Sequence, residues 1–453
     1  MKDLTKGPIF KTIVMFAIPI FFGNLFQLFY SLTDTRIVGT YLGDTALAAV
    51  GGSTVLCNLL INFVNGMTLG FSVPMARFYG GRRMERLRKA FAMSVGLGLV
   101  LCVLVVTFSQ IFIDELMVFM RIEEYLRADA KSYCMVLLGG IFFSFAYNLG
   151  ASVLRALGNS VTPLLMLVCS SILNVFLDIY FIGSLHLGVF GAALATVIAQ
   201  AVSATLCMVY LWKKYPLLHF RVREMKPETG LLKELLESGC SMAFMSSLVQ
   251  FGTLMLQTAI NGLGQNIVVA HTSARKVTEI FMMAFSITGS AMCTFVGQNI
   301  GAGNYDRVRK GLFGAMAFLA GWVGFVILLA HTAAPQLVTM ITGTETPEVL
   351  ETAERYLKFN AMFYAFAACV TLFRNTLQGM GSHIVPIVSS SLELIGKIVF
   401  AKLMVPNIGY WGVILAEPVS WMIMVIPLAV QLVRSPYLRQ RTGSKEIQRN
   451  SEE

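Results

Sequence analysis

Long apolar stretches separated by short polar segments dominate this chain. A helix of roughly 20 residues spans the ~30 Å hydrocarbon core of a bilayer. The pattern therefore predicts twelve membrane-spanning helices, near residues 11–39, 46–75, 90–113, 131–154, 163–183, 189–212, 235–260, 267–297, 311–334, 352–377, 386–405 and 410–433. Basic residues precede the first stretch, as in a signal peptide, but it is too long and lacks a small-residue cleavage site, so we interpret it as a membrane helix.

Composition supports a membrane environment. The 453 residues are 56% hydrophobic and 13% charged, with a mean hydropathy of +0.70, whereas soluble proteins carry roughly 25% charged residues. The predicted fold class is an all-α polytopic membrane protein. The net charge of +10 would indicate nucleic acid in a soluble chain, but here the basic residues lie between apolar stretches, so we expect a bilayer and no nucleic acid as partner.

The charge of the connecting segments alternates along the chain. Segment 76–89 is basic, segment 114–129 is acidic, and segment 213–233 is basic again. Because basic loops stay on the cytoplasmic side, both termini and the central segment are predicted to be cytoplasmic, in a multi-pass protein of the plasma (inner) membrane.

The two halves of the sequence repeat each other. Residues 42–91 align with 263–312 at a constant offset of 221, including a charged loop. Six crossings per half make the halves parallel repeats, related by an axis along the membrane normal, and such paired lobes commonly alternate access by rocking. The predicted organisation is an N-lobe over 1–215, a cytoplasmic linker over 216–233 and a C-lobe over 234–453.

Ionisable side chains inside membrane spans are costly and are therefore functional candidates. Asp34 lies about five residues, or ~8 Å, below the predicted outer end of the first helix, and Asp178 lies at a similar depth on the fifth. Asn174 is one turn deeper on the same face, and Thr196 reaches this level from the sixth helix. The cluster predicts an ion-coupling site for H⁺ or Na⁺, because two close carboxylates in low dielectric do not ionise together easily. Local helix capping is the alternative role for the two aspartates.

The second half lacks this acidic pair. At the repeat offset Asp34 falls on Met255 and Asp178 on Val399, so ion coupling is expected in the N-lobe alone. The other ionisable residues of the C-lobe either pair along a helix face, as Arg275 with Glu279 or Glu393 with Lys397, or line a cavity or gate the lobes. The sequence leaves these roles open for Arg275, Lys276, Glu279, Glu393, Lys397 and Glu417.

Several motifs resemble the multidrug and toxic compound extrusion (MATE) family over essentially the whole chain. They are the segments 30–39 and 42–49, Arg155-Ala-Leu-Gly158-Asn159 with Pro163, Asn174-x3-Asp178, the segment 188–196, and Val296-Gly-Gln298-Asn299-Ile-Gly301-Ala-Gly303. The resemblance, to the DinF-like and MepA-like bacterial branches, implies the MATE-type two-lobe fold. It also implies an antiporter that exports amphiphilic or cationic drugs, and so confers antibiotic resistance, using inward H⁺ or Na⁺ movement.

The resemblance also implies roles for particular residues. It implies that the ion-coupling residues are Asp34, Asn174, Asp178 and Thr196, and that the cleft-lining residues are Gln27, Tyr30, Tyr133 and Asn148. The NorM-like branch carries an acidic residue on helix 7, where this chain has only Gln250 and Gln257. Pro19, in the middle of the first helix, is either a hinge or a passive kink.

Two other functions compete with this interpretation. A related flippase for lipid-linked or amphiphilic precursors shares the two-lobe plan, and a strongly cationic central cavity would favour it. A membrane-embedded enzyme would need Asp-rich metal motifs or a catalytic His/Asp loop, and ATP-driven transport a Gly-x4-Gly-Lys-Ser/Thr loop; the sequence has none of them. We expect a monomeric transporter of small molecules, without enzyme activity, cofactor or metal other than Na⁺ at the acidic cluster.

Overall fold

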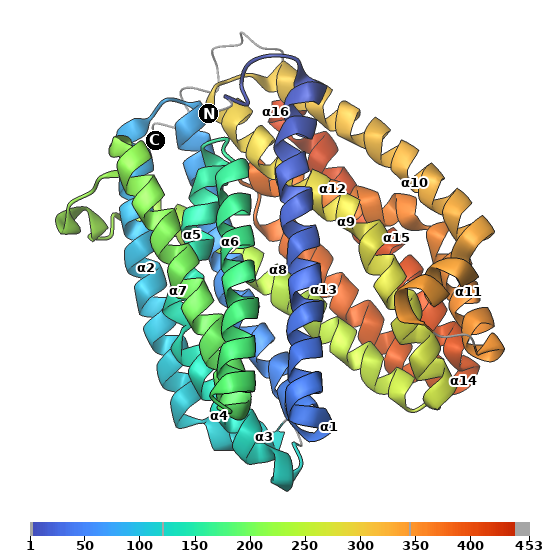
Figure 1. Cartoon of the computed structure of the whole chain (residues 1–453). Coiled ribbons are helices and arrows are strands. Elements are labelled where there is room, and N and C mark those ends of the chain that lie inside the picture. The colour runs from blue at the N-terminus through green and yellow to red at the C-terminus, as the bar shows by residue number, and fades with distance from the viewer. Residues whose placement is uncertain (1–2, 120–121, 344–345, 440–453) are drawn as a thin grey trace. The chain divides into compact units, whose positions relative to one another are not determined.

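The computed structural model describes residues 3–119, 122–343 and 346–439, and these residues form helices and no strand (Figure 1). Ten helices of this described part are long and apolar enough to cross a membrane, and the number rises to twelve when each of two bent helix pairs counts as one span. The predicted all-α polytopic fold is confirmed.

Contacts divide the chain into two compact units. The first unit holds Ile18–Phe244, and the second holds Leu4–Ala17 together with the chain from Met245 onward. Helix α1 (Ile9–Gly80) changes unit between Ala17 and Ile18, next to Pro19, and α8 (Thr229–Asn261) changes unit between Phe244 and Met245. Both helices therefore contribute residues to both units.

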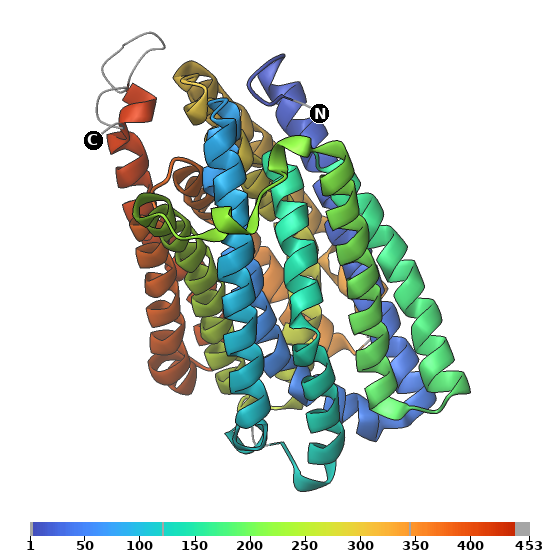
Figure 2. The same ribbon diagram turned by 90° about the vertical axis from the view of Figure 1, so that its left-hand side faces the viewer.

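The first unit is a helical bundle around α7 (Gly188–Lys214). This helix packs against α4 (Arg127–Gly139), α5 (Ile141–Ala156) and α6 (Val161–Asp178). The other elements between α1 and α8 are α2 (Met84–Ile111), α3 (Ile113–Phe119), η1 (Glu124–Leu126), η2 (Ile179–Ser184), η3 (Pro216–Leu218) and η4 (Val222–Met225). The segment between α7 and α8 crosses α2, on which η4 packs (Figure 2).

Small residues bring α1 and the start of α8 into backbone contact within the first unit. A Cβ atom at Gly66 would lie 2.6 Å from Ala243 Cα, and one at Gly70 would lie 2.3 Å from the Ser238 carbonyl oxygen. Any larger residue at these two positions would separate the helices. Glycine at such contacts is typical of helix packing in membranes, where close approach supplies the association energy.

The second unit is built around α9 (Gln265–Gly301), which packs against α10 (Tyr305–Thr342), α11 (Pro347–Ala361) and α12 (Tyr364–Gly379). The remaining elements of this unit are α13 (Ile384–Val399), η5 (Phe400–Met404), α14 (Val405–Ile408), α15 (Tyr410–Arg434) and α16 (Pro436–Arg439).

The backbone of the N-terminal segment forms hydrogen bonds with side chains of the second unit. Leu4 is fully buried; its N–H donates to Gln298 (3.2 Å), and its carbonyl accepts from Asn299 (3.2 Å). Arg307 donates to the Gly7 carbonyl at 2.8 Å. The Gln298-Asn299 dipeptide of the 296–303 motif is thus a binding point for the start of the chain.

Two of the predicted spans are bent rather than straight. The span predicted at 131–154 is bent by 45° at Gly140, and the span predicted at 352–377 is bent by 56° between Ala361 and Tyr364. Gly140 lies against Val197, where a Cβ atom would approach a methyl group to 2.5 Å, so the lack of a side chain permits this close contact at the bend. No glycine or proline marks the second bend, and nothing in the sequence predicts it.

The sequence repeat extends to the irregularities of the backbone. Positive φ angles recur at Gly43 (78°) and Gly264 (102°), at an offset of 221, and at Gly158 (82°) and Gly381 (85°), at an offset of 223. The π turns η2 and η5 begin 221 residues apart, at the ends of α6 and α13. The two halves therefore share a backbone plan.

Candidate functional site

Helix α1 positions the first carboxyl group of the site. Asp34 is half-buried and lies nine residues before Gly43, where a positive φ breaks α1 into its two membrane-crossing parts. Tyr30 is one turn earlier, so the two side chains share a helix face.

Helix α6 positions the second carboxyl group. Asn174 is 1% exposed and Asp178 is 0% exposed, and they lie one turn apart on the same face. Asp178 is the last residue of α6 before the π turn η2. π turns often occur at functional sites, because the additional residue changes the direction in which neighbouring side chains point.

The structure brings all four predicted ion-coupling residues together. The Asp34 and Asp178 carboxyl groups are within hydrogen-bonding reach of each other. With its amide oriented to face these partners, Asn174 donates to Asp178 Oδ2 (2.9 Å) and to the Tyr30 hydroxyl (3.3 Å), and accepts from the Thr196 backbone N–H (3.1 Å). The Thr196 side chain lies beside the Tyr30 hydroxyl. Three helices, α1, α6 and α7, thus converge at one point.

No basic residue compensates the two carboxyl groups within the described part of the chain. Asp34 and Asp178 take part in none of its ion pairs, and the buried Oδ1 atom of each carboxyl group lacks a hydrogen-bond partner. Buried charge without a partner is strongly unfavourable, and a shared proton or a bound cation removes the penalty. The described residues contain no group of three or more His, Cys, Asp or Glu side chains, so Na⁺ here would also need the neutral oxygens of Asn174 and Thr196.

Tyr133 lies beside this cluster. It is 7% exposed and lies close to Asp34, Tyr30 and Thr54. The sequence analysis missed Thr54, because a threonine in an apolar helix carries no charge to mark it, and only its contact with Tyr133 associates it with the site.

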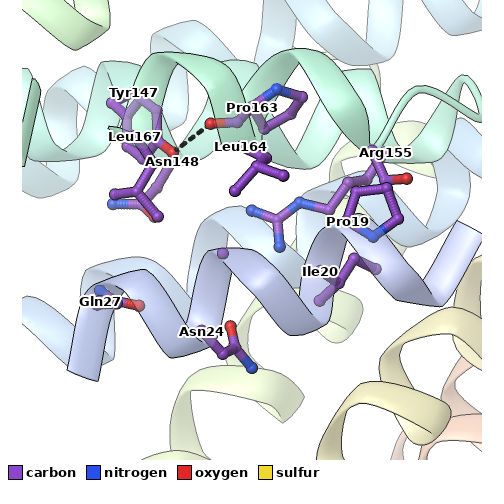
Figure 3. A pocket seen from close by; sticks show the side chains of 12 residues that line it. Pro19, Ile20, Asn24, Gln27, Tyr147, Asn148, Arg155, Pro163, Leu164 and Leu167 are labelled. Atoms are coloured by element: carbon purple, nitrogen blue, oxygen red, sulfur yellow. Dashed lines mark hydrogen bonds between the residues drawn. The ribbon is translucent and has the colours of Figure 1, made fainter. Parts of the chain in front are cut away.

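Gln27 and Asn148 lie elsewhere in the first unit. They line a cavity of about 90 Å³ between α1, α5 and α6 (Figure 3). The residues around this cavity are Pro19, Ile20, Gly23, Asn24, Gln27, Tyr147, Asn148, Arg155, Ser160, Pro163, Leu164 and Leu167. Of the four predicted cleft residues, two thus line the cavity, whereas Tyr30 and Tyr133 contact the acidic cluster.

Several ionisable residues of the second unit form ion pairs with one another. Arg275 forms an ion pair with Glu417 at 2.7 Å, so the expected alternative of an Arg275–Glu279 pair is wrong; Lys276 and Glu279 are exposed. The buried Tyr356 hydroxyl also donates to Glu417, at 3.0 Å.

A second ion-pair group lies on α12 and α13. Glu393 pairs with Lys397 at 3.0 Å, as helix spacing predicts, and with Arg374 at 3.6 Å. Arg374 was not singled out in the sequence, although an arginine in the predicted span 352–377 was a signal that could have identified it.

Comparison with known proteins places this chain in a family. The MatE family model matches residues 19–180 and 241–403, one match in each half of the chain. The probable multidrug resistance protein YoeA of Bacillus subtilis is 27% identical over 403 residues, covering 86% of each chain. The multidrug export protein MepA of Staphylococcus aureus is 22% identical, covering 96% of this chain and 97% of that protein.

A solved structure has the same fold. The outward-facing conformation of a multidrug resistance MATE family transporter of the MOP superfamily has a TM-score of 0.88 at 24% identity, covering 97% of this chain and 98% of that one. The family model matches well over half of the sequence. The chain therefore belongs to the MatE (MATE) family and is a membrane transporter, not an enzyme.

Proposed function

We propose that the chain is a secondary active antiporter for multidrug efflux. It exports small amphiphilic or cationic compounds and is driven by inward movement of H⁺ or Na⁺ through Asp34 and Asp178. One observation carries this proposal: two buried carboxyl groups face each other without any basic partner in the described chain. The names of the relatives, which include multidrug export and resistance proteins, support the substrate class.

The acidic cluster acts as a switchable charge. Without a proton or cation the two carboxylates repel each other, and binding of either removes the repulsion. Because the concentration of the coupling ion differs between the two sides of the membrane, the charge of the site depends on which side it faces. An ion can shift a conformational equilibrium only through such a difference in binding between two states.

Helix α1 connects ion binding to the substrate cavity. Asp34 lies seven residues, or ~10 Å, along α1 from Gln27, which lines the cavity. Pro19 lies where α1 changes unit, and its missing N–H removes one helical hydrogen bond. We assign Pro19 a hinge role in a rocking movement of two lobes, 1–215 and 234–453, joined by the linker 216–233.

The protein acts as a monomer in the inner membrane. Both of its termini are cytoplasmic, because the basic segments 76–89 and 213–233 are expected on the cytoplasmic side. It needs no cofactor other than the coupling ion. The alternative of a lipid-precursor flippase would be favoured by a strongly cationic cavity, and the ion pairs of Arg275 and Arg374 argue against it.

The test is transport by purified protein in vesicles under an imposed Na⁺ gradient and, separately, a pH gradient. Wild-type protein is expected to move a cationic dye under at least one gradient. Asp34→Asn keeps the shape of the side chain but removes its charge, so transport should fall to background while the protein remains folded and inserted.

The matched control is Asp129→Asn, which removes one acidic charge from an exposed position of α4. This variant should transport like wild type. Gradient-driven transport by Asp34→Asn at the wild-type rate would refute the ion-site assignment.

A further inference from the structure

Arg155 differs from the other arginines of the spanning helices discussed above. Arg275 is paired with Glu417 and Arg374 with Glu393, whereas Arg155 forms no ion pair in the described part of the chain. Its Nε donates a hydrogen bond to the Ala151 carbonyl (3.2 Å), which leaves the two terminal amino groups of the guanidinium available.

The guanidinium of Arg155 points into the cavity of the first unit. It extends from the end of α5 toward α1, between Leu164 and Ile20 (Figure 3). Two of the polar residues beside it are already engaged: the Tyr147 hydroxyl donates to the Pro163 carbonyl (3.1 Å), and Asn148 Nδ2 donates to the Ser144 carbonyl (2.8 Å). Among the residues that line this cavity, Arg155 is the charged one, and its charge is positive.

The cavity is partly open and Arg155 is half-buried, so its guanidinium is reached by water and is able to exchange that water for an anion. Its planar fork matches a carboxylate, which it holds with two parallel hydrogen bonds. A cavity of about 90 Å³ accommodates an acidic group with a few water molecules, not a whole drug molecule. The geometry thus fits one end of a longer ligand.

The other end of such a ligand would face the acidic cluster. Along α1 the cavity residues Ile20, Asn24 and Gln27 recur every three or four positions, and Tyr30 and Asp34 continue the same spacing. One stripe of α1 therefore leads from a basic site at Arg155 to an acidic site at Asp34.

We propose that the Arg155 cavity binds the carboxylate of an amphiphilic substrate, so that the transporter selects compounds bearing both an acidic and a cationic group. The inference deepens the proposed efflux function and rests on it for the identity of the ligand as a substrate.

The test compares two ligands that differ only in the acid. A rhodamine dye with a free carboxylate and the methyl ester of the same dye are titrated onto the purified full-length protein, without any ion gradient. Arg155→Gln should weaken binding of the acid by about tenfold, the worth of one charge-assisted hydrogen-bond pair. Binding of the ester should change by less than about twofold, and Arg155→Lys should retain part of the preference for the acid.

Arg36→Gln is the matched control, because Arg36 is an exposed arginine of α1 outside the cavity. It should leave the binding of both dyes unchanged. Equal weakening of acid and ester by Arg155→Gln would indicate a purely structural role and overturn the proposal, as would unchanged binding of the acid.

A phospholipid phosphate is the other source of an oxyanion at Arg155. The titration is repeated in vesicles of phosphatidylcholine with and without phosphatidylglycerol. Competition by the anionic lipid that disappears in Arg155→Gln would assign the cavity to a lipid headgroup and overturn the proposal. Acid-selective binding without gradient-driven transport would instead refute only the antiporter mechanism, because equilibrium binding needs no gradient.

Discussion

The two units share a backbone repeat but treat buried charge in opposite ways. In the first unit Asp34 and Asp178 face each other without a base, and Arg155 has no carboxylate partner in the described chain. In the second unit Arg275 pairs with Glu417 at 2.7 Å. The proposed ion and ligand sites therefore lie in the unit whose buried charges lack partners, whereas the second unit pairs its buried acids with its own bases.

Equivalent positions of the repeat show where this difference arises. At the offset of 221 Thr54 corresponds to Arg275, and at 223 Tyr133 corresponds to Tyr356. The corresponding side chains are neighbours in each unit, Thr54 beside Tyr133 and Arg275 beside Tyr356. The same contact is therefore neutral in one unit and cationic in the other.

A third pair of equivalent positions shows the same difference between the two units. Thr196 of the ion cluster corresponds to Glu417 at the offset of 221, so the second unit supplies both an acid and an arginine beside the tyrosine. The Arg275 guanidinium lies beside Glu417, where the proposed site of the first unit would hold an exchangeable cation. Such a pair is costly to break but carries nothing across the membrane.

The largest expected effect is the loss of ion-driven transport when the acidic pair of the first unit is disrupted. Asp178→Asn removes one of the two acids and should reduce ion-driven transport to background, since a single acid no longer provides the coupled pair. Glu417→Gln should retain the ion dependence of transport at a reduced level of stable protein. Both are measured as initial rates in vesicles, normalised to folded protein. Loss of ion dependence in Glu417→Gln would mean that the second unit also couples ions.

The second-largest effect is expected on stability, and it tests whether the Arg275–Glu417 ion pair stabilises the second unit. Arg275→Gln leaves Glu417 buried without its base, and breaking such a pair costs about 3–5 kcal/mol. The unfolding temperature in detergent should therefore fall by several degrees. Arg275→Gln combined with Glu417→Gln should recover most of this loss, because no uncompensated charge remains. Glu279→Gln is the control, since Glu279 is exposed and should have no measurable effect.

The sequence predicted the fold from hydropathy, because lipid requires long apolar helices whatever their neighbours are. It also placed Asp34 and Asp178 at one depth, since helix rise converts residue number into depth. Contacts between helices were harder to predict. Residue spacing left Arg275 either paired with Glu279 or lining a cavity, whereas its partner in the structure is Glu417, which lies 142 residues away in sequence.

One neutral residue beside the site, Thr54, was not identified from the sequence, whereas Asn174 and Thr196 were. Thr54 has no charge and no motif to mark it, and its role depends on packing against Tyr133. The bend between Ala361 and Tyr364 has no glycine or proline to predict it. Charge and hydropathy are local properties of a sequence, whereas these features depend on residues from separate helices.

A smaller effect is expected where the second unit has two bases for one acid. Lys397→Met removes the 3.0 Å partner of Glu393 but leaves Arg374 at 3.6 Å. The loss should be about 1.5–3 kcal/mol, the worth of one hydrogen bond to a charged group. Adding Arg374→Met should cost more than the sum of the single variants, because only the pair leaves Glu393 without a base. Additive losses in the unfolding temperature would contradict this description of the group.

The smallest effect concerns an ion pair at the surface. Glu224 on η4 accepts the Arg221 backbone N–H (2.8 Å) and pairs with Arg88 (2.7 Å), and these partners hold the pKa of its carboxyl below the usual value. A lowered pKa in the folded state contributes stability above the unfolded pKa near 4.5, and this contribution is lost as the pH falls through the folded pKa. The unfolding temperature of Glu224→Gln should therefore fall slightly less than that of wild type on acidification. Because solvent screens an exposed pair, the difference should be close to the detection limit. A shift as large as that of Arg275→Gln would mean that burial does not set the strength of these pairs, and the contrast between the two units would lose its physical basis.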